Sequence, residues 1–552
     1  MRNIKIFFIL ITFLGMIKLY PISKNNMNKN ENIKLFLEDF YNQISVKEEQ
    51  LNKAAWLLET TGSKDAADLV ASLSNEYKLF FSNENIYKKL IEYSKIKSLD
   101  NLTKRQIDIL IDSFKANMIP KELMKEISIK ESELYQAYAN FRPMIDNKKV
   151  SENQIREILE NEKSIDIRKK AWEASKEVGA ALAPKIIELA KLRNQAAKHV
   201  GYDNYFDMML DLNEINKEKL FQTFADLKKR TDKSFNETMM QINEVLAEKF
   251  SVPANQLGPW AWKEPHGQED PIKSSKLNDI FSDKDILAIA KSYYEKMGFD
   301  IDTLIKNSDL YEREGKNQHA FCTDIDRKKD VRTLNNIKPN PQWMETLLHE
   351  FGHAVYDLNI NEKLPWLLRQ PAHIFVTEAI ALLMGRQPYT KEFLMDFCNI
   401  SDEKLFQDIH NGAKRRQLIF SRFVFLMTEF ESNLYSDPNQ DLNKLWWDLY
   451  EKYYNLPKPK NREGKADWAA KYHIGLAPVY YYNYLLGEVL ASMLNQKLIG
   501  LTKDNIIWKK QAADFLTNKM FRVGSSYRWD DLVEHVTNQK FSIDSWVNEC
   551  NN

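Results

Sequence analysis

The chain has 552 residues, and its 78 Lys and Arg balance its 78 Asp and Glu, so the formal net charge is zero. This balance argues against a bulk polyanion such as DNA as partner, and the 43% hydrophobic and 12% aromatic content excludes a largely disordered chain. The low counts of 16 Gly and 17 Pro argue against a sandwich, barrel or propeller fold. The three cysteines are scattered, which excludes a fully paired disulfide framework or a Cys-rich zinc module.

Residues 1–22 have the pattern of a targeting segment. Arg2 and Lys5 precede an apolar run from Ile6 to Ile17, as in a signal peptide. The run is short for a membrane span, so we expect cleavage and export to the periplasm or the medium, with an uncleaved N-terminal anchor as the alternative. Residues 23–32 are polar and are predicted to form a linker.

The rest of the chain is predicted to be mainly α-helical. Apolar residues recur at three- and four-residue spacing, with charged residues between them, over 35–41, 51–58, 155–159, 171–196 and 220–250. We predict one helical domain over 33–552, possibly in two lobes with a boundary at the Gly- and Pro-containing stretch 251–271. The best strand signal is a short segment at 319–325.

The most specific chemical motif is His-Glu-x-x-His at residues 349–353. His349 and His353 are four residues apart on a predicted helix, so both imidazoles project from one face and can bind one Zn²⁺. Glu350 then lies beside the open coordination position, where it can take a proton from a zinc-bound water. The alternative is an amphipathic helix with solvent-facing histidines, and the flanking apolar residues and Gly352 argue against it.

A catalytic zinc needs a third protein ligand. Glu378 lies 25 residues after His353 and opens an apolar helical run, so a second helix packed on the first can bring its carboxylate to the metal. His373 is closer in sequence but falls in a Pro-containing loop. Glu378 also has a purely structural alternative, because an acidic residue in a first helical turn complements the helix dipole.

A third constellation lies late in the chain. Lys471 and His473 precede a group of tyrosines at positions 480, 481, 482 and 484. Peptide hydrolysis passes through a tetrahedral oxyanion, which His N–H and Tyr O–H groups can stabilise. Tyr481 and Tyr484 are three residues apart and would share a helix face. A single Tyr is also common in hydrophobic cores, so the assignment of an oxyanion site rests on the combination of these residues with the His-Glu-x-x-His motif.

Several blocks resemble the angiotensin-converting enzyme family of zinc dipeptidyl carboxypeptidases, in a bacterial-type form, and more distantly the thimet-type oligopeptidases. The matching blocks are 171–202, 319–324, 349–357, 364–380, 446–447 and 471–474. They run from about residue 171 to 474 and beyond, so the likeness covers most of the chain after the leader. The resemblance implies two helical lobes around a deep cleft, with zinc at its floor and a small β element on one wall.

The resemblance also implies the metal centre and the base. His349, His353 and Glu378 would bind one Zn²⁺ per chain, and Glu350 would act as general base and then protonate the leaving amine. The family usually has an acidic residue four positions after the third ligand, where this chain has Leu382. The groups that support the metal ligands must therefore differ here.

For the oxyanion, the resemblance implies His473 and one of the late tyrosines. The spacing from His473 to the tyrosines departs from the family pattern by about one residue, so Tyr482 competes with Tyr484 for this role. The Arg that accompanies the catalytic Tyr in the family, and is associated with chloride activation, has no counterpart at 480–484. We therefore predict no chloride dependence.

Four residues are implied in substrate binding. Lys471 would pair with the C-terminal carboxylate of a peptide, Tyr481 would contact the substrate, and His319 would help to hold it. Ala320 would offer backbone hydrogen bonds to an extended peptide, as in strand addition.

Taken together, the sequence predicts a zinc peptidase that cleaves short peptides and releases C-terminal dipeptides. The enzymatic alternatives are an internal-cleaving oligopeptidase of the thimet type and a single-residue carboxypeptidase of the same clan. The third alternative is a non-catalytic peptide-binding protein, which would have no need of Glu350. No nucleic-acid partner is expected, and another divalent metal is the alternative to zinc.

Overall fold

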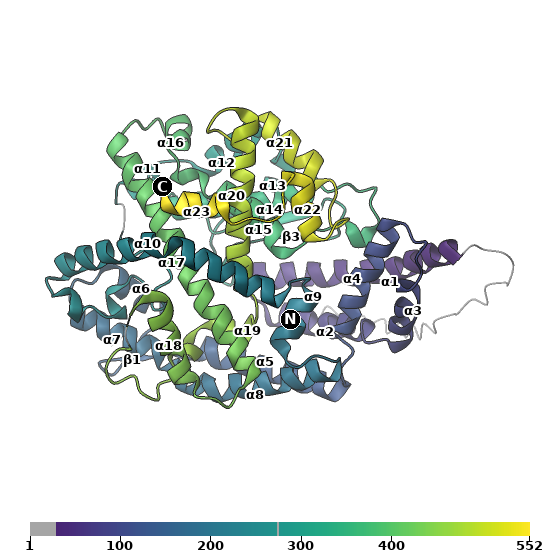
Figure 1. Ribbon diagram of the computed structural model, residues 1–552, viewed down its shortest axis with the longest axis horizontal. Helices are drawn as coiled ribbons and strands as arrows, with labels where there is room; N and C mark the ends of the chain where they lie inside the picture. Colours follow the sequence, from purple (N-terminus) through teal and green to yellow (C-terminus); the bar gives the residue numbers. More distant parts are fainter. Residues whose placement is uncertain (1–28, 273–274, 457) are drawn as a thin grey trace, which may run out of the picture.

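The computed structural model describes residues 29–272, 275–456 and 458–552 and is dominated by helices (Figure 1), which confirms the predicted mainly α fold. The predicted leader and residues 23–28 of the predicted linker lie outside the described residues. The first helix begins at Lys29, before the predicted domain start at residue 33. In the described part of the chain, no helix is both long and apolar enough to cross a bilayer.

Two short strand pairs divide the helices into three groups along the chain. Before the first pair come α1 (Lys29–Thr61), α2 (Lys64–Phe80), α3 (Glu84–Ser94), α4 (Asn101–Lys115) and α5 (Lys121–Asn140). Between the pairs come α6 (Glu152–Asn161), α7 (Ile165–Lys176), α8 (Val178–His199), α9 (Tyr205–Leu212), α10 (Lys217–Phe250), α11 (Ser275–Phe281), α12 (Ile286–Met297) and α13 (Asp302–Asn307). After the second pair come α14 (Pro341–Leu358), α15 (Ile374–Gly385), α16 (Lys391–Cys398), α17 (Glu403–Ser436), α18 (Leu442–Tyr454), α19 (Tyr472–Leu476), α20 (Tyr482–Thr502), α21 (Lys510–Leu516), α22 (Trp529–Thr537) and α23 (Asp544–Asn551).

Both strand pairs are antiparallel: β1 (Met144–Ile145) with β2 (Lys148–Lys149), and β3 (Phe321–Asp324) with β4 (Val331–Leu334). In the second pair Phe321 lies opposite Leu334. Strand β3 confirms the extended segment predicted at 319–325, whereas β4 was not predicted. Among the described residues β4 is the only strand partner of β3, so the other edge of β3 is free of a strand partner. The Asn52 side chain hydrogen-bonds to the Asp324 carbonyl at the end of β3.

The periodic stretches of the sequence all lie in helices. Residues 35–41 and 51–58 belong to α1, 155–159 to α6 and 220–250 to α10. Helix α10 starts where the Asn216 side chain accepts a hydrogen bond from a backbone N–H of the first turn, as an N-cap residue does. The stretch 171–196 is divided at Glu177 into α7 and α8.

One large hydrophobic cluster joins buried side chains from Leu134 to Cys550, and a smaller one joins the N-terminal helices to Trp366 and Leu367. The segment 251–271 contributes the buried Trp262 to the large cluster, so it is packed, and the lobe boundary there stays a prediction. Helix α17 packs on α20 and α23 at one side and on α8 and α18 at the other. In Figure 1 it runs between the upper and lower halves of the molecule.

Two glycines let three helices approach closely. A Cβ at Gly352 of α14 would lie 2.9 Å from the Ala381 Cα of α15, and a Cβ at Gly487 of α20 would lie 3.2 Å from the Glu378 Cβ of α15. Packed interiors leave no room for an added group at such distances. Helix α15 is therefore held tightly between α14 and α20, which fixes Glu378 relative to the side chains of α14.

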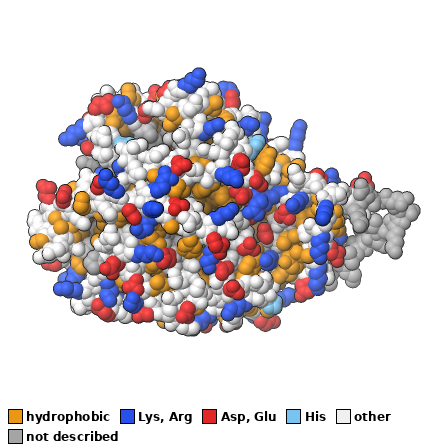
Figure 2. Space-filling view, in the orientation of Figure 1, with side chains coloured by type: hydrophobic (Ala, Val, Ile, Leu, Met, Phe, Trp, Pro, Cys, Tyr) orange, Lys and Arg blue, Asp and Glu red, His pale blue; other side chains and the backbone are white. Residues whose placement is uncertain are grey.

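The surface carries charges of both signs. Figure 2 shows Lys and Arg side chains interspersed with Asp and Glu over one face. Several are i,i+4 helix pairs, such as Lys53 with Glu49 and Lys88 with Glu84. Exposed pairs of this kind contribute only about 0.3–0.5 kcal/mol each, so the stability of the fold rests on its apolar core.

Candidate active site

Helix α14 presents a stripe of polar side chains to a large pocket. The helix begins at the N-cap residue Asn340, whose side chain accepts a backbone hydrogen bond of the first turn. Side chains four residues apart lie on one helix face. Four such residues, Glu345, His349, His353 and Asp357, line the same pocket of about 1080 Å³.

The predicted metal ligands come together in this pocket. One ligand atom from each of His349, His353 and Glu378 lies within 4.8 Å of the other two, and the His349 Nε2 is 3.6 Å from a Glu378 carboxylate oxygen. The two histidines come from α14 and the carboxylate from α15. Two imidazoles and one carboxylate are the donor set of a catalytic zinc centre with an open position.

Burial controls the charge of these groups. It lowers the pKa of His349 to about 4 and that of His353 well below its usual range, so both imidazoles are neutral and can act as ligands. Burial, reinforced by the Glu378 carboxylate, raises the pKa of Glu350 to about 8. Burial also raises the pKa of Glu378 to about 7. Two buried carboxylates side by side repel each other, and a divalent cation would relieve this repulsion.

Two contacts around the ligands were not predicted. The Thr377 hydroxyl lies 2.7 Å from His353 Nδ1, and the Tyr480 hydroxyl hydrogen-bonds to the Glu378 carboxylate, which counteracts the rise in its pKa. Thr377 could have been suspected as the immediate neighbour of Glu378. Nothing in the sequence singled out Tyr480 from the tyrosines that follow it.

His373, the alternative third ligand, has a different task. Its Nδ1 accepts the Phe375 backbone N–H and so caps α15, and its Nε2 lies 2.9 Å from the Asn213 carbonyl oxygen. Both ring nitrogens are therefore occupied by backbone groups. Glu378, five residues after this N-cap, is the carboxylate of α15 that reaches the two histidines.

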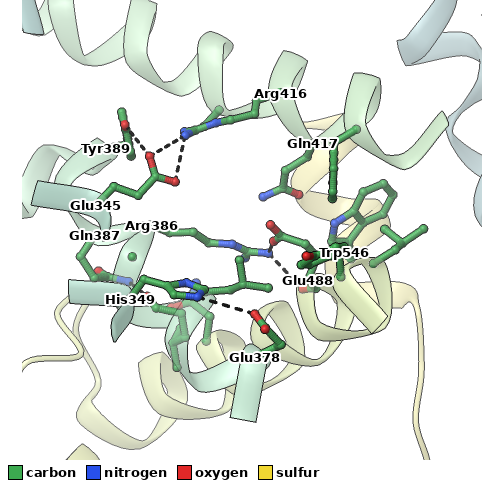
Figure 3. Close-up of a pocket in the computed structure, with 18 of the residues that line it drawn as sticks. Glu345, His349, Glu378, Arg386, Gln387, Tyr389, Arg416, Gln417, Glu488 and Trp546 are labelled. Carbon is green, nitrogen blue, oxygen red and sulfur yellow. Dashed lines mark hydrogen bonds and ion pairs between the residues drawn. The ribbon is translucent and has the colours of Figure 1, made fainter. Parts of the chain in front are cut away.

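Ion pairs line the pocket on one side of the metal-ligand group (Figure 3). Glu345 accepts hydrogen bonds from the Tyr389 hydroxyl at 2.6 Å and from the Arg416 guanidinium at 3.2 Å. Arg386 pairs with Glu488. Because these charges are paired, they give this wall a polar lining in which opposite charges largely offset each other.

Strand β3 borders the pocket on another side. Ala320, just before β3, and Phe321 and Cys322 within it all line the pocket, and the edge of β3 that does not pair with β4 has no strand partner among the described residues. His319 is exposed and is not among the lining residues, and its backbone N–H donates to the Asn317 side chain. The structure thus brings Ala320 to the cleft, but it does not bring His319 to the metal ligands.

Lys471 and Tyr481 both hydrogen-bond to a third residue, Gln268. The Gln268 side-chain oxygen accepts hydrogen bonds from the Lys471 ammonium at 3.1 Å and from the Tyr481 hydroxyl at 2.8 Å. Gln268 also lines the pocket that holds His349. Lys471 is only 6% exposed, and burial lowers its pKa to about 8. Sequence reasoning missed Gln268, which lies in the predicted boundary segment and carries no motif.

The late tyrosines separate into two environments. Tyr484 lines the pocket, and burial, reinforced by Glu378, raises its pKa to about 12. Tyr482 is buried in the large hydrophobic cluster, away from the pocket lining. His473 packs edge-on against Tyr481, with ring centroids 4.8 Å apart. Burial, with the charge of Lys471, lowers the pKa of His473 to about 3, which makes it a neutral hydrogen-bond donor.

Comparison with known proteins places these features in a family. A family model described as angiotensin-converting enzyme matches residues 27–545. The chain is 21% identical to angiotensin-converting enzyme of Bos taurus over 561 residues, which is 94% of this chain and 42% of that protein. It is 22% identical to Carboxypeptidase 1 of Bacillus subtilis over 519 residues, 87% of this chain and 89% of that one. A third match, at 26% over 249 residues, is an Oligoendopeptidase F homolog of Lactococcus lactis, covering 43% of this chain and 38% of that protein.

The chain thus spans less than half the length of the mammalian enzyme it matches and nearly the whole length of the bacterial carboxypeptidase. The family model, by contrast, covers both the α14–α15 metal-ligand group and the late segment with Lys471 and His473. Because this model extends over nearly the whole chain, the protein belongs to the angiotensin-converting enzyme family of metallopeptidases.

Proposed function

We propose that this protein is a zinc-dependent peptidase that releases dipeptides from the free C-termini of short peptides. The observation that carries the proposal is the buried Lys471, which hydrogen-bonds to Gln268 at the lining of the pocket that holds the metal-ligand group. Among the described residues no salt bridge includes Lys471, and its hydrogen-bond partner is the neutral Gln268. Glu264 and Glu269 act on the Lys471 charge without forming a salt bridge with it. A buried cation without a directly paired carboxylate is costly, and the C-terminal carboxylate of a peptide would supply that partner.

The metal-ligand group fits zinc by its chemistry. His349, His353 and Glu378 supply two neutral nitrogen ligands and one carboxylate, and three protein ligands leave a coordination position open. When bound there, Zn²⁺ would act as a Lewis acid that makes water more acidic and polarises the scissile carbonyl.

Glu350 is the proposed general base. It follows His349 directly on α14, is 7% exposed, and faces the pocket. Its carboxylate would accept a proton from the attacking water and then pass that proton to the nitrogen of the leaving peptide. The edge of β3 without a strand partner, together with Ala320 just before it, would meanwhile hold the substrate backbone extended.

His473 and Tyr484 are the proposed donors to the oxyanion. Both side chains are neutral at physiological pH, because burial lowers the pKa of His473 and raises that of Tyr484. Neutral donors fixed in a partly buried site stabilise a developing negative charge without having to reorganise. Tyr484 is favoured over Tyr482 because it lines the pocket, while Tyr482 lies in the core.

The alternative is a different cleavage position with the same chemistry. The similarity to a carboxypeptidase and to an oligoendopeptidase F homolog supports single-residue release or internal cleavage as that alternative. These activities differ from dipeptide release in how far the scissile bond lies from the residue that binds the C-terminus. Export, with or without an N-terminal anchor, is a separate proposal that rests on the apolar run at residues 6–17.

A free C-terminus is expected to be required. We expect kcat/KM for an amidated peptide to be about 10–100-fold below that for its free-acid form, because a hydrogen bond to a charged group contributes about 1.5–3 kcal/mol. In Lys471→Met the free acid should lose this advantage, so that both peptides are cleaved at similar low rates. Initial rates for the peptide pair with both proteins provide the measurement. Equal cleavage of acid and amide by the unaltered protein would exclude Lys471 as a carboxylate anchor.

A further inference from the structure

We propose that Thr377 is the positioning residue of the metal centre, and that its hydroxyl holds the His353 ring so that Nε2 faces the metal. This inference rests on the metal site of the proposed function. The Thr377 Oγ1 is 2.7 Å from His353 Nδ1, and the contact bridges α15 and α14. Thr377 is 9% exposed, so bulk water competes little for either partner.

The contact determines which ring nitrogen can bind a metal. A neutral imidazole carries one N–H and one lone pair. If Nδ1 donates its proton to the Thr377 oxygen, the lone pair is on Nε2, which is then free to act as ligand. If Nδ1 accepted instead, Nε2 would carry the proton and could not coordinate. Metal binding through His353 Nε2 therefore requires Thr377 to be the acceptor, and the 2.7 Å separation is a hydrogen-bond distance for that arrangement.

The structure also explains why a hydroxyl, that of Thr377, and not a carboxylate contacts His353. Leu382, which lies one turn after Glu378, packs against α20, where a Cβ at Gly487 would be 3.2 Å from its Cδ1. With Leu at this position, α15 has no carboxylate there to hydrogen-bond to the histidines. Glu350 and Glu378 already place two buried carboxylates beside the metal-ligand group. A hydroxyl orients His353 without adding a third negative charge to this repulsion.

Thr377 and Glu378 are neighbours on α15, so one turn of this helix contains both a metal ligand and the residue that supports another ligand. Successive side chains of a helix point about 100° apart, so Thr377 reaches His353 while Glu378 reaches toward His349. Because α15 is packed closely against α14 at Gly352, these two contacts are made together. Helix α15 thus supplies both a ligand and the support of another ligand.

The test is the zinc affinity of three variants, measured without substrate. Thr377→Val removes the hydroxyl at nearly constant shape, and Thr377→Ser keeps it. Thr428→Val makes the same change at a buried Thr of α17 whose hydroxyl has no hydrogen-bond partner among the described residues. Competition of the whole protein with a chromogenic chelator gives each affinity. Loss of a support of this kind costs about 10–100-fold in metal affinity. We expect that loss in Thr377→Val and near-normal affinity in the other two.

Two results would overturn the inference. One is Thr377→Val with the zinc affinity of the unaltered protein. The other is a loss of zinc affinity that Thr377→Ser shares, or one that comes with a fall in the unfolding temperature of the metal-free Thr377→Val protein. Either would indicate a merely structural role. If Thr377→Val does not fold, Thr377→Ala removes the same hydroxyl and is expected to show the same loss. Because no peptide is used, failure of the proposed peptidase activity leaves this result unaffected.

Discussion

Replacing Glu350 with Gln is expected to lower kcat by about 10²-fold or more while the protein still binds one zinc ion, because removal of a general base typically costs 10²–10⁴-fold. The amide of Gln has nearly the shape of the carboxylate but cannot accept the proton of the attacking water. Glu350 is not one of the three grouped metal ligands, so zinc binding should survive. Steady-state kinetics and metal analysis of the same preparation provide the two measurements.

The control for this prediction is Glu362→Gln, the same change at an exposed residue that pairs with Lys329 and does not line the pocket. It should leave both kcat and zinc content unchanged. If Glu350→Gln turned over peptide as fast as the unaltered protein, the proposed mechanism would be wrong. If it lost its zinc as well as its activity, Glu350 would belong to the metal centre rather than act as base.

Replacing Glu378 with Ala is expected to reduce zinc affinity more than any other single change outside the two histidines. Glu378 supplies the carboxylate of a three-ligand group, and its loss leaves two neutral imidazoles facing a divalent cation. We expect a loss greater than the about 10–100-fold that removal of a supporting group costs. Peptidase activity should then return only at high zinc concentrations.

Glu392→Ala is the matched control, because Glu392 also lines the pocket but is not in the metal-ligand group. It removes one negative charge from the same cavity and should leave zinc affinity nearly unchanged. Full zinc occupancy of Glu378→Ala at nanomolar free zinc would reject Glu378 as the third ligand. An equal loss in both variants would mean that overall charge, and not coordination, governs the affinity.

The parts of the site that follow from local geometry could be predicted from the sequence. His349 and His353 share a helix face wherever that helix lies, because four residues make about one turn. The brief strand at 321–324 also followed from its composition, although its partner β4 did not. These features depend on neighbours in the chain, so a single sequence contains the information needed.

The parts that depend on packing between distant segments could not be predicted in the same way. Gln268 joins Lys471 and Tyr481 across more than 200 residues, and no local pattern marks it. Thr377 reaches His353 only because Gly352 lets α15 approach α14. Each contact requires the relative placement of two helices or loops, which propensity and spacing do not specify.

The late tyrosines show how a helix start decides which side chains reach a site. Val479 has a left-handed backbone with a φ of 57°, and α20 begins at Tyr482. This turn sets the phase of the helix, so Tyr484 faces the pocket while Tyr482 enters the core. The sequence left these two tyrosines as competitors, because their spacing from His473 departs from the family pattern by about one residue and the phase of the helix cannot be seen from spacing alone.

The most direct test of the proposed function is a time course of product masses. The zinc-loaded protein would be given one unstructured decapeptide with a free C-terminus. Stepwise loss of dipeptides from that end is the predicted result, with Lys471 holding each new carboxylate in turn. Single residues or internal fragments as the first products would contradict dipeptide release and would move the protein to the carboxypeptidase or oligopeptidase alternative.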